Sequence, residues 1–404
     1  MRTDVLIVGG GLVGQALALA LAAHEIGSII VERGDPDTAL APEADGRVSA
    51  IASAPARMLR ALGLGDVLDD HGQPIATILV GEDPRRLPLR FDAPDDEPLG
   101  IMLENRRLRA ALLGKVRGAP LVRLLAPAHV ATMDRDDAGV RALLDDGRTI
   151  AAPLAIAADG RHSALRAAAG IRGAAWNYRA TALVGTFAHE RPHAATATEI
   201  FHRSGPFAQL PMRDLPDGRH RSAMVWTAPP ATAAGLMALS VRALGIEAER
   251  RFGRRLGAME LLAPASAYPL GLHHVERYWA KRLILVGDAA HVVHPVAGQG
   301  LNMGLRDVAA LAEVLDGAFG IGLDPGSPEV ARRYETWRRS DNFAVALATD
   351  GLIRLFGMPG RPLSVLRQAG MAAVGRVPPL RRALMAIARG ESGDLPPLLQ
   401  AGKM

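Results

Sequence analysis

The chain has 404 residues, of which 49% are hydrophobic and 22% charged, a composition typical of a globular protein with two or three structural units. It has no cysteine, which excludes disulfides, thiolate metal sites and thiol redox chemistry, and its 12 histidines show no HExxH-type metal-binding spacing. The net charge is +5, but only 4% of the residues are aromatic and no basic run is interleaved with aromatic residues, which argues against nucleic-acid binding. Because the chain has no cysteine, any redox chemistry must come from a bound cofactor.

The N-terminal segment predicts neither a cleavable signal nor a membrane span. Its first apolar run, residues 5–8, leads directly into a glycine-rich turn, and the helix that follows is interrupted by His24 and Glu25. These features predict a cytoplasmic protein.

The first 32 residues predict a strand, a glycine turn, a helix and a second strand. An apolar run over residues 4–8 precedes Gly9, Gly11 and Gly14, followed by an Ala/Leu-rich helix over 12–23 and a strand over 28–32. A glycine turn lets the backbone approach a pyrophosphate, and the helix N-terminus offers it free N–H groups. Glu32, at the end of the second strand, would accept hydrogen bonds from a ribose diol. This unit predicts an ADP-containing dinucleotide, either FAD or NAD; a glycine turn without a ligand explains less of the context.

The rest of the chain predicts a discontinuous dinucleotide-binding domain with a second domain inserted into it. The expected elements are a helix over 50–62, a Pro/Asp/Arg-rich excursion over 76–99, a helix over 101–116, a meander of strands over 121–150, a buried strand over 153–158, alternating strands over 179–267, an apolar strand over 282–286, a helix over 301–315 and helical structure from 328.

A second motif, DGRHSALR over residues 159–166, lies between a strand and a helix. Asp159 and Ser163 would cap a helix whose N-terminus faces a phosphate, and Arg166 would add positive charge. An ordinary strand-to-helix turn explains this segment equally well.

A third motif begins with a Gly-Asp pair at 287–288 and continues through HPVAGQGLN at 294–302. Asp288 is placed to hydrogen-bond a sugar-alcohol chain, and Gly298 and Gly300 would let a flat ring lie against the backbone. The N–H groups of Gly300, Leu301 and Asn302 would stabilise negative charge on a ring carbonyl. A simple helix start does not explain so long a loop of small residues.

In this order and spacing the three motifs resemble the class A flavoprotein monooxygenases, the p-hydroxybenzoate hydroxylase-like family. The segment 294–302, Asp45-Gly46-Arg47 and Glu104-Asn105 are similar to the branch that hydroxylates ubiquinone precursors. The resemblance covers nearly the whole chain and is least diagnostic over 179–267. It implies an α/β fold with a Rossmann-like FAD-binding domain of the glutathione-reductase type (1–75, 100–178 and 268–340), an inserted β-sheet substrate domain (76–99 and 179–267) and a C-terminal helical region (341–404).

The resemblance also implies a role for each motif residue. The ADP half of FAD would be held by Gly9, Gly11, Leu12, Val13, Gly14, Glu32 and Arg33. The remaining cofactor contacts would come from Arg47 and Asn105 at the pyrophosphate and ribityl region, Val130 at the adenine, Asp159 at FAD and NADPH, Asp288 at the ribityl chain, and Pro295, Gly298, Gln299, Gly300, Leu301 and Asn302 at the isoalloxazine ring. Many members outside the ubiquinone branch carry Arg or Gln where Asn105 stands.

The reaction implied by the resemblance is hydroxylation. NAD(P)H would reduce the flavin, O2 would add to give a C4a-hydroperoxide, and one oxygen atom would pass to a phenolic ring, without a metal. His294 and Gln299 would lie nearest the ring edge and are the candidate catalytic residues; a hydrogen bond that positions the loop explains His294 equally well.

The C-terminal stretch between residues 351 and 390 contains seven Arg and no Asp or Glu. Basic amphipathic helices can lie on anionic lipid or dock into a biosynthetic complex, which would suit a polyprenylated substrate. Packing of the apolar faces on the FAD domain, with solvated arginines, is the simpler interpretation.

The leading hypothesis is therefore an FAD-dependent hydroxylase of a polyprenylated phenol in ubiquinone biosynthesis. A hydroxylase of a small soluble phenol and a non-catalytic FAD-binding subunit of a biosynthetic complex remain open. A halogenase is disfavoured, because its WxWxIP segment is missing and the four Trp lie far apart.

Overall fold

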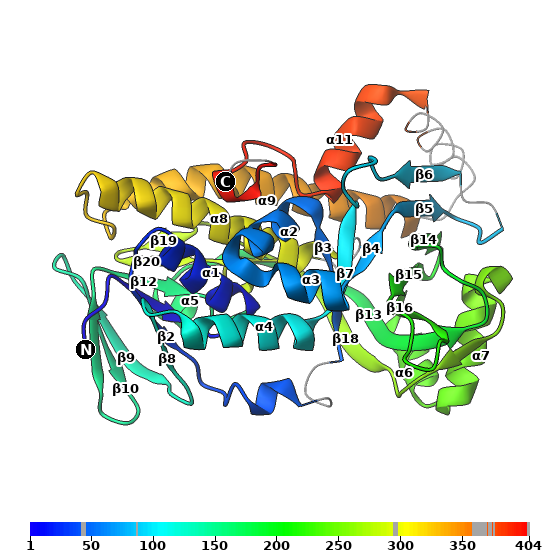
Figure 1. The fold of residues 1–404 in the computed structure, drawn as a ribbon, viewed down its shortest axis with the longest axis horizontal. Helices are drawn as coiled ribbons and strands as arrows, with labels where there is room; N and C mark the ends of the chain where they lie inside the picture. Colours follow the sequence, from blue (N-terminus) through cyan, green and yellow to red (C-terminus); the bar gives the residue numbers. More distant parts are fainter. Residues whose placement is uncertain are drawn as a thin grey trace.

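The computed structural model describes residues 1–41, 46–85, 88–293, 298–357, 370, 374 and 376–401 (Figure 1). A layered α/β half that contains the N-terminus lies on the left of Figure 1, and a large, mostly antiparallel sheet with short helices beside it lies on the right. Long C-terminal helices run along the upper side of both halves. This arrangement agrees with the predicted fold class: a Rossmann-like half, a β-sheet domain and a C-terminal helical region.

The left half is built on a mainly parallel sheet. Within the described residues this sheet has six strands in the order β19-β20-β12-β1-β2-β8, and only β19 runs antiparallel to its neighbour. The strands are β1 (Val5–Val8), β2 (Ser28–Val31), β8 (Val122–Leu125), β12 (Leu154–Ala157), β19 (Trp279–Ala280) and β20 (Leu283–Leu285). The register pairs Val5 with both Ser28 and Leu154, so segments far apart in the sequence are joined at the centre.

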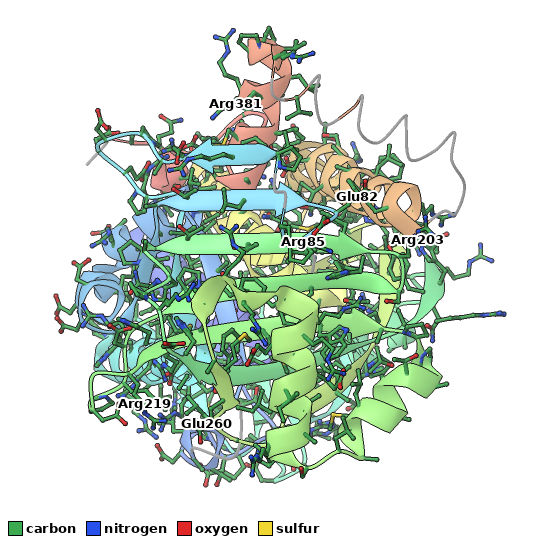
Figure 2. The ribbon with its side chains drawn as sticks, turned by 90° about the vertical axis from the view of Figure 1, so that its right-hand side faces the viewer. Glu82, Arg85, Arg203, Arg219, Glu260 and Arg381 are labelled. Carbon is green, nitrogen blue, oxygen red and sulfur yellow. The ribbon has the colours of Figure 1, made fainter. Side chains whose placement is uncertain are left out.

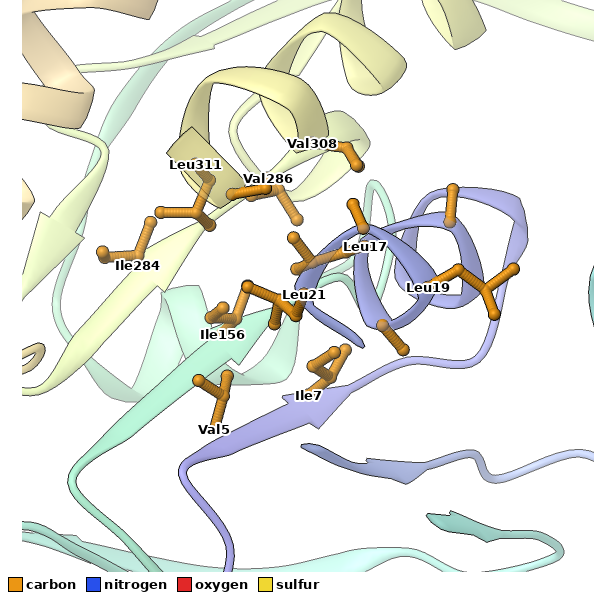
Figure 3. Close-up of a cluster of buried hydrophobic side chains, with 14 of the residues drawn as sticks. Val5, Ile7, Leu17, Leu19, Leu21, Ile156, Ile284, Val286, Val308 and Leu311 are labelled. Atoms are coloured by element: carbon orange, nitrogen blue, oxygen red, sulfur yellow. The ribbon is translucent and has the colours of Figure 1, made fainter. Parts of the chain in front are cut away.

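Helix α1 (Leu12–Ala23) is buried between this sheet and α8 (Gln299–Gly320). A helix that is apolar all round must be covered on several sides, and residues 14–21 of α1 are all buried. Figure 3 shows Leu17 and Leu21 between Ile7 of β1 and Leu311 of α8. The first glycine loop is therefore anchored in the largest core of the molecule.

Further elements complete this half. Two three-stranded sheets of the described chain have the orders β11-β10-β9 and β3-β7-β4. Their strands are β9 (Val130–Arg135), β10 (Val140–Leu144), β11 (Thr149–Ala152), β3 (Val48–Ala52), β7 (Gly100–Glu104) and β4 (Gln73–Ile75). The helices are α2 (Ser53–Leu59), a π-helical turn η2 (Arg60–Leu64), α3 (Gly65–His71), α4 (Asn105–Gly118), α5 (Ala164–Ala168), and the 3-10 turns η1 (Thr38–Leu40) and η4 (Gly287–Ala289).

Two predicted helices begin too early. The helix expected from residue 50 begins at Ser53, after β3, and the helix expected from residue 101 begins at Asn105, after β7. Residues 100–103 are all buried, because β7 lies between β3 and β4 and is covered by helices. A strand buried on both faces shows no alternation, so the apolar residues matched the helical pattern of the residues that follow.

The right half is a large, mostly antiparallel sheet. Over the described residues its nine strands include a path β21-β18-β13-β16-β15-β14-β5-β6, with β17 paired to β13. They are β5 (Thr77–Gly81), β6 (Leu89–Asp92), β13 (Gly173–His189), β14 (Thr196–His202), β15 (Gly205–Met212), β16 (His220–Ala228), β17 (Met259–Leu261), β18 (Ser266–Val275) and β21 (His291–Val292). The predicted domain boundaries at 178/179 and 267/268 fall inside β13 and β18, so the division into domains remains a prediction.

The two faces of this sheet are covered differently. Helices α6 (Pro230–Met237) and α7 (Val241–Phe252), with the 3-10 turn η3 (Arg254–Leu256), cover the face toward the viewer in Figure 2, which we call the outer face. Ile200, Phe207 and Trp226 pack with these helices. On the opposite, inner face, Ala197 and Ala223 pack instead with Met102 of β7 and other residues of the left half.

The C-terminal region is helical, as predicted. It comprises α9 (Pro328–Gly357), α11 (Pro378–Ala388) and the 3-10 turn η6 (Pro397–Leu399). Arg389 and Arg57 of α2 both pair with Glu97 and Glu391, which ties this region to the left half. No helix within the described ranges is long and apolar enough to cross a membrane.

Candidate active site

The first glycine loop leaves no room for a side chain at Gly9 or Gly14. Gly9 has φ +111°, and a Cβ there would lie 2.3 Å from the carbonyl oxygen of Ala158; a Cβ on Gly14 would lie 1.9 Å from the carbonyl oxygen of Gly9. Gly11 faces open space, and the N-terminus of α1 has no side-chain cap. The loop is thus pressed against the end of β12. The N–H groups in the first turn of α1 have no carbonyl partner within the helix and no side-chain cap, which fits a pyrophosphate.

Glu32 lies beside this loop at the end of β2. Its Oε2 accepts a hydrogen bond from Gly10 N at 2.6 Å, and its Oε1 accepts one from Gly34 N at 2.8 Å. The carboxylate therefore has a fixed position within reach of a nucleoside bound along the loop. Arg33 is exposed next to it.

Val130 opens β9 near the same edge. Ala128 N donates to the carbonyl oxygen of Glu32 at 2.8 Å, so the chain that leads into β9 follows the end of β2. The backbone predicted to line the adenine site therefore lies near the carboxylate predicted to bind the ribose.

The third motif packs directly on the first. A Cβ on Gly287 (φ +58°) would lie 3.4 Å from Cγ1 of Val13, and one on Gly304 would lie 2.7 Å from Cγ2 of Val13. The first turn of α1, which contains Leu12 and Val13, is thus in contact with both the Gly-Asp turn and α8. Asp288 is exposed between two buried neighbours, with its carboxylate directed away from the core. The two motifs form one site.

The loop at the start of α8 is fixed by the side chain of Asn302. Gly298 has φ +63° and caps the helix without a side-chain hydrogen bond, and Gly300 faces open space. The side chain of Asn302 is buried: its Oδ1 accepts from Ala52 N at 2.9 Å, and its Nδ2 donates to the carbonyl oxygens of Ala50 at 2.8 Å and Gly298 at 3.0 Å. Asn302 therefore locks β3 to the loop, while the first-turn N–H groups of α8 point from the helix end.

Asn105 and Arg47 lie at the other end of β3. Asn105 N donates to the carbonyl oxygen of Arg47 at 3.0 Å, and the hydroxyl of Ser49 donates to Asn105 Oδ1 at 2.7 Å. Since β3 is also bonded to Asn302, the structure brings Arg47 and Asn105 to the same site as the α8 loop. Arg47 and Gln299 each have interaction partners, and Gln299 is buried.

The second motif contacts both glycine loops. A Cβ on Gly9 would lie 2.8 Å from the backbone nitrogen of Asp159, and Arg166 donates to the carbonyl oxygen of Ala289 at 2.9 Å. Ser163 caps α5, as expected, by accepting from Arg166 N at 3.0 Å. Oδ2 of Asp159 accepts from Leu165 N at 3.4 Å, but its buried Oδ1 has no partner within the described chain. An unsatisfied buried oxygen beside the glycine loop fits a ligand that donates to it.

Three predicted positions cannot be placed. His294 and Pro295, together with Asp45 of the DGR segment, lie outside the residues that the structure describes. No group of three or more potential metal ligands occurs in the described part of the chain.

A buried polar cluster behind the Gly-Asp turn escaped the sequence analysis. Asp307 of α8 is fully buried; its Oδ2 accepts from Gly287 N at 3.0 Å and lies 2.6 Å from His291 Nε2, and its Oδ1 accepts from Arg338 Nε at 2.9 Å and Asn342 Nδ2 at 3.0 Å. We call Asp307, His291, Arg338 and Asn342 the Asp307 cluster.

The Asp307 cluster holds a charge in the core. Burial acts to raise the pKa of Asp307, but the adjacent His291 and Arg338 more than offset it and hold this pKa below its usual range. The ionised carboxylate fixes the backbone of the Gly-Asp turn. An Arg-Asp pair inside an otherwise apolar helix was the available signal in the sequence.

Comparisons with known proteins identify the family of the chain. A family model described as an FAD binding domain matches residues 2–335. The chain is 46% identical over 402 residues to the ubiquinone hydroxylase UbiL of Rhodospirillum rubrum, covering 99% of this chain and 92% of that protein. It is 34% identical to the 3-demethoxyubiquinol 3-hydroxylase of Escherichia coli, covering 96% and 98% of the two chains.

Solved structures show the same architecture. PqsL of Pseudomonas aeruginosa, described as a probable FAD-dependent monooxygenase, superimposes with a TM-score of 0.76 at 26% identity, covering 88% of this chain and 97% of that one. The p-nitrophenol 4-monooxygenase PnpA of Pseudomonas putida has a TM-score of 0.80 at 18% identity, covering 98% and 100%, and supports the fold alone. The predicted resemblance is confirmed: the chain belongs to the FAD-dependent monooxygenase family that contains the ubiquinone hydroxylases.

Proposed function

We propose that this FAD-dependent monooxygenase hydroxylates the aromatic ring of a polyprenylated phenol in ubiquinone biosynthesis, with NAD(P)H as electron donor and O2 as oxidant. The observation that carries the proposal is the convergence of the glycine loops: Val13 contacts Gly287 and Gly304, and Asn302 ties the α8 loop to β3. The identity to two named ubiquinone-pathway hydroxylases over nearly the full chain supports the substrate class.

We assign the cofactor contacts as the sequence predicts them. The loop of Gly9, Gly11 and Gly14 would receive the pyrophosphate, Glu32 the ribose, and Asp288 the ribityl chain. Gly9 and Gly14 fit this role because a side chain at either position would collide with a neighbouring backbone carbonyl oxygen, so only glycine permits this tight loop. Asp288 fits its role because its carboxylate is exposed beside the loop.

Bound FAD supplies the oxygen-activating chemistry, and the protein's part is to orient the ring and exclude water. The uncapped N-terminus of α8 provides N–H donors and the positive end of a helix dipole, which would stabilise negative charge on the flavin carbonyl nearest to it. His294 and Gln299 stay candidates for the ring edge.

The reaction is tested with the purified FAD-loaded protein. NADPH consumption and product formation are measured with an isoprenoid phenol and with small phenols such as 4-hydroxybenzoate. Coupled hydroxylation of the isoprenoid phenol is expected, and a gene deletion should accumulate one under-hydroxylated quinone precursor. Tight coupling only with the small phenols would establish the soluble-phenol alternative, and FAD that NADPH cannot reduce would establish the non-catalytic one.

We also propose that the α11 segment makes peripheral contact with a membrane. Several C-terminal arginines are engaged by the protein itself: Arg354 pairs with Asp350, Arg381 donates to the carbonyl oxygen of Arg90, and Arg389 pairs with Glu97. Arg376 and Arg382 are exposed, beside the exposed Val377 and Leu380 of the α11 segment. These residues would form the lipid-facing surface.

A further inference from the structure

Glu199 is a carboxyl group on the inner face of the large sheet. Strand β14 alternates: Ile200 packs with α6 and α7 on the outer face, whereas Ala197 packs with β7 on the inner face. Phe201, also on the inner face, stacks on Phe356 of α9 with ring centroids 4.2 Å apart. Since side chains two positions apart share a face, Glu199 lies between Ala197 and Phe201 on the inner face.

The surroundings of Glu199 are apolar. Its cross-strand neighbours are Ala208 of β15 and Val80 of β5, and the same row continues through Val225 and Val184. Directly paired side chains in a sheet are the closest contacts available. Within the described residues, the carboxyl group makes no hydrogen bond or ion pair.

An unpartnered carboxyl in such a place is costly. Burial raises the pKa of Glu199 to about 8, and no charged neighbour contributes to the shift. The residue nevertheless keeps part of its surface exposed, as do Val184 and Val225 in the same row. The group is thus enclosed by protein and still reachable by a ligand, as expected of a functional rather than a structural carboxyl.

The inner face continues to the loop at the start of α8, residues 298–302, which we call the flavin loop because the proposed function places the flavin ring there. The cluster around Ala197 includes Ala50, whose Cβ lies 3.2 Å from the position of a Cβ on Gly298 and whose carbonyl oxygen accepts from Asn302. Glu199 is two residues, about 7 Å, further along β14 from Ala197. A largely apolar surface with few polar groups, adjoining a cofactor loop, is the usual form of a small-molecule site.

We propose that Glu199 is the substrate-recognising group of the inner face: its carboxyl hydrogen-bonds a hydroxyl on the aromatic ring and thereby determines which ring carbon is presented to the flavin loop. This inference rests on the proposed function. A carboxyl suits the role because it accepts a hydrogen bond when ionised and both donates and accepts when neutral.

The test compares Glu199→Leu and Glu199→Gln with Glu260→Gln. Glu260 is an exposed carboxyl on β17 of the same sheet, paired with Arg219, as Figure 2 shows. The dissociation constant of an isoprenoid phenol, and of its methyl ether, is measured by the flavin absorbance change without NADPH. FAD content, thermal stability, KM, kcat and the position of the new hydroxyl are recorded with the same preparations.

Glu199→Leu is expected to weaken binding of the phenol about 10- to 150-fold, with little effect on the methyl ether, and Glu199→Gln to weaken it less. Both variants should keep wild-type FAD content and at least wild-type thermal stability, since the carboxyl they remove has no partner among the described residues, and Glu260→Gln should match the wild type.

Several outcomes would overturn the inference. Unchanged phenol binding in Glu199→Leu, an equal loss for the methyl ether, or a loss of stability and FAD would each do so; the last would mean a structural role. If the wild type binds and hydroxylates no aromatic ring, the proposed function fails, and the inference fails with it. An active wild type with an unaffected Glu199→Leu variant contradicts the inference alone.

Discussion

The two sheets of this protein differ in how they form a site. In the left half, backbone groups at the ends of parallel strands make the site, and glycines mark where the backbone must be bare. On the inner face of the right half, side chains from neighbouring strands would make the proposed substrate site, and nothing in the local sequence marks which of them meet. A cofactor site made by the backbone can thus be found in a sequence, whereas a substrate site made by side chains requires the register of the strands.

The largest expected effect comes from removing the buried carboxylate of Asp307, which supports the cofactor site. Asp307→Ala should lower stability by about 3–5 kcal/mol, because Arg338 and His291 would remain buried without their partner. It should also loosen the Gly-Asp turn, since Gly287 N loses its acceptor. Thermal unfolding and FAD content measure both effects. Asp316→Ala, at a half-exposed position of the same helix where the carboxylate faces His24, is the matched control; an equal effect there would refute the role of the Asp307 cluster.

A second change tests whether the backbone makes the cofactor site. Gly14→Ala should cost roughly 1–3 kcal/mol, because its Cβ collides with the carbonyl oxygen of Gly9, and FAD should be lost with the loop geometry. Gly11→Ala meets no protein atom and should fold normally, yet lose FAD if the pyrophosphate lies there. Gly114→Ala, on an open side of α4, should change neither. A Gly14→Ala protein that retains FAD would contradict the assignment.

The pH dependence of stability tests the substrate side. The folded-state pKa of Glu199 is about 8 against an ordinary value of 4.5, so the folded protein binds this proton more tightly than the unfolded chain does. Its contribution to stability is present at low pH and is lost as the pH rises from about 4.5 to 8. Glu199→Gln removes this loss, so its advantage in melting temperature should grow over that range, by roughly 2 °C or more. A pH-independent difference would place the carboxyl in water.

The smallest effect concerns the exposed arginines of the α11 segment. Replacing Arg376 and Arg382 by Glu should weaken binding to anionic vesicles about fivefold per charge, because each basic residue near such a surface contributes about 1 kcal/mol. FAD content and turnover of small phenols should stay unchanged. Arg250→Glu, exposed on α7, is the control, and sedimentation with vesicles is the measurement. Equal binding by all variants would exclude the α11 segment as the lipid-facing surface.

Much of the fold could be predicted because its signals are local. The first strand-turn-helix-strand unit lies within 32 consecutive residues, and its glycines report the backbone geometry directly. The end of β3 and most of β7 could not be separated from the helices that follow them, because Ile51, Ala52 and residues 100–103 are all buried and show no alternation.

The site was predicted less completely. The loops and their glycines were visible, but the second use of Asn302, as a side-chain lock on β3, depends on a contact over 250 residues. The Asp307 cluster joins two helices, and Glu199 becomes notable only when Ala208 and Val80 are known to flank it. Such contacts carry no spacing that a single sequence can reveal.

The pairing of β1 with β12, and of β12 with β20, has a consequence for how the chain matures. Val5 pairs with Leu154, and Ala155 pairs with Leu283. Contacts so distant in sequence form late, after large loops have closed. During synthesis, which proceeds from the N-terminus, the cofactor site at the ends of β1, β12 and β20 stays incomplete until most of the polypeptide has emerged from the ribosome. In the large sheet the pairings β5-β6, β14-β15 and β15-β16 are local and can form before the nucleotide is captured, whereas the pairing of β13 with β18 also waits for a large loop to close.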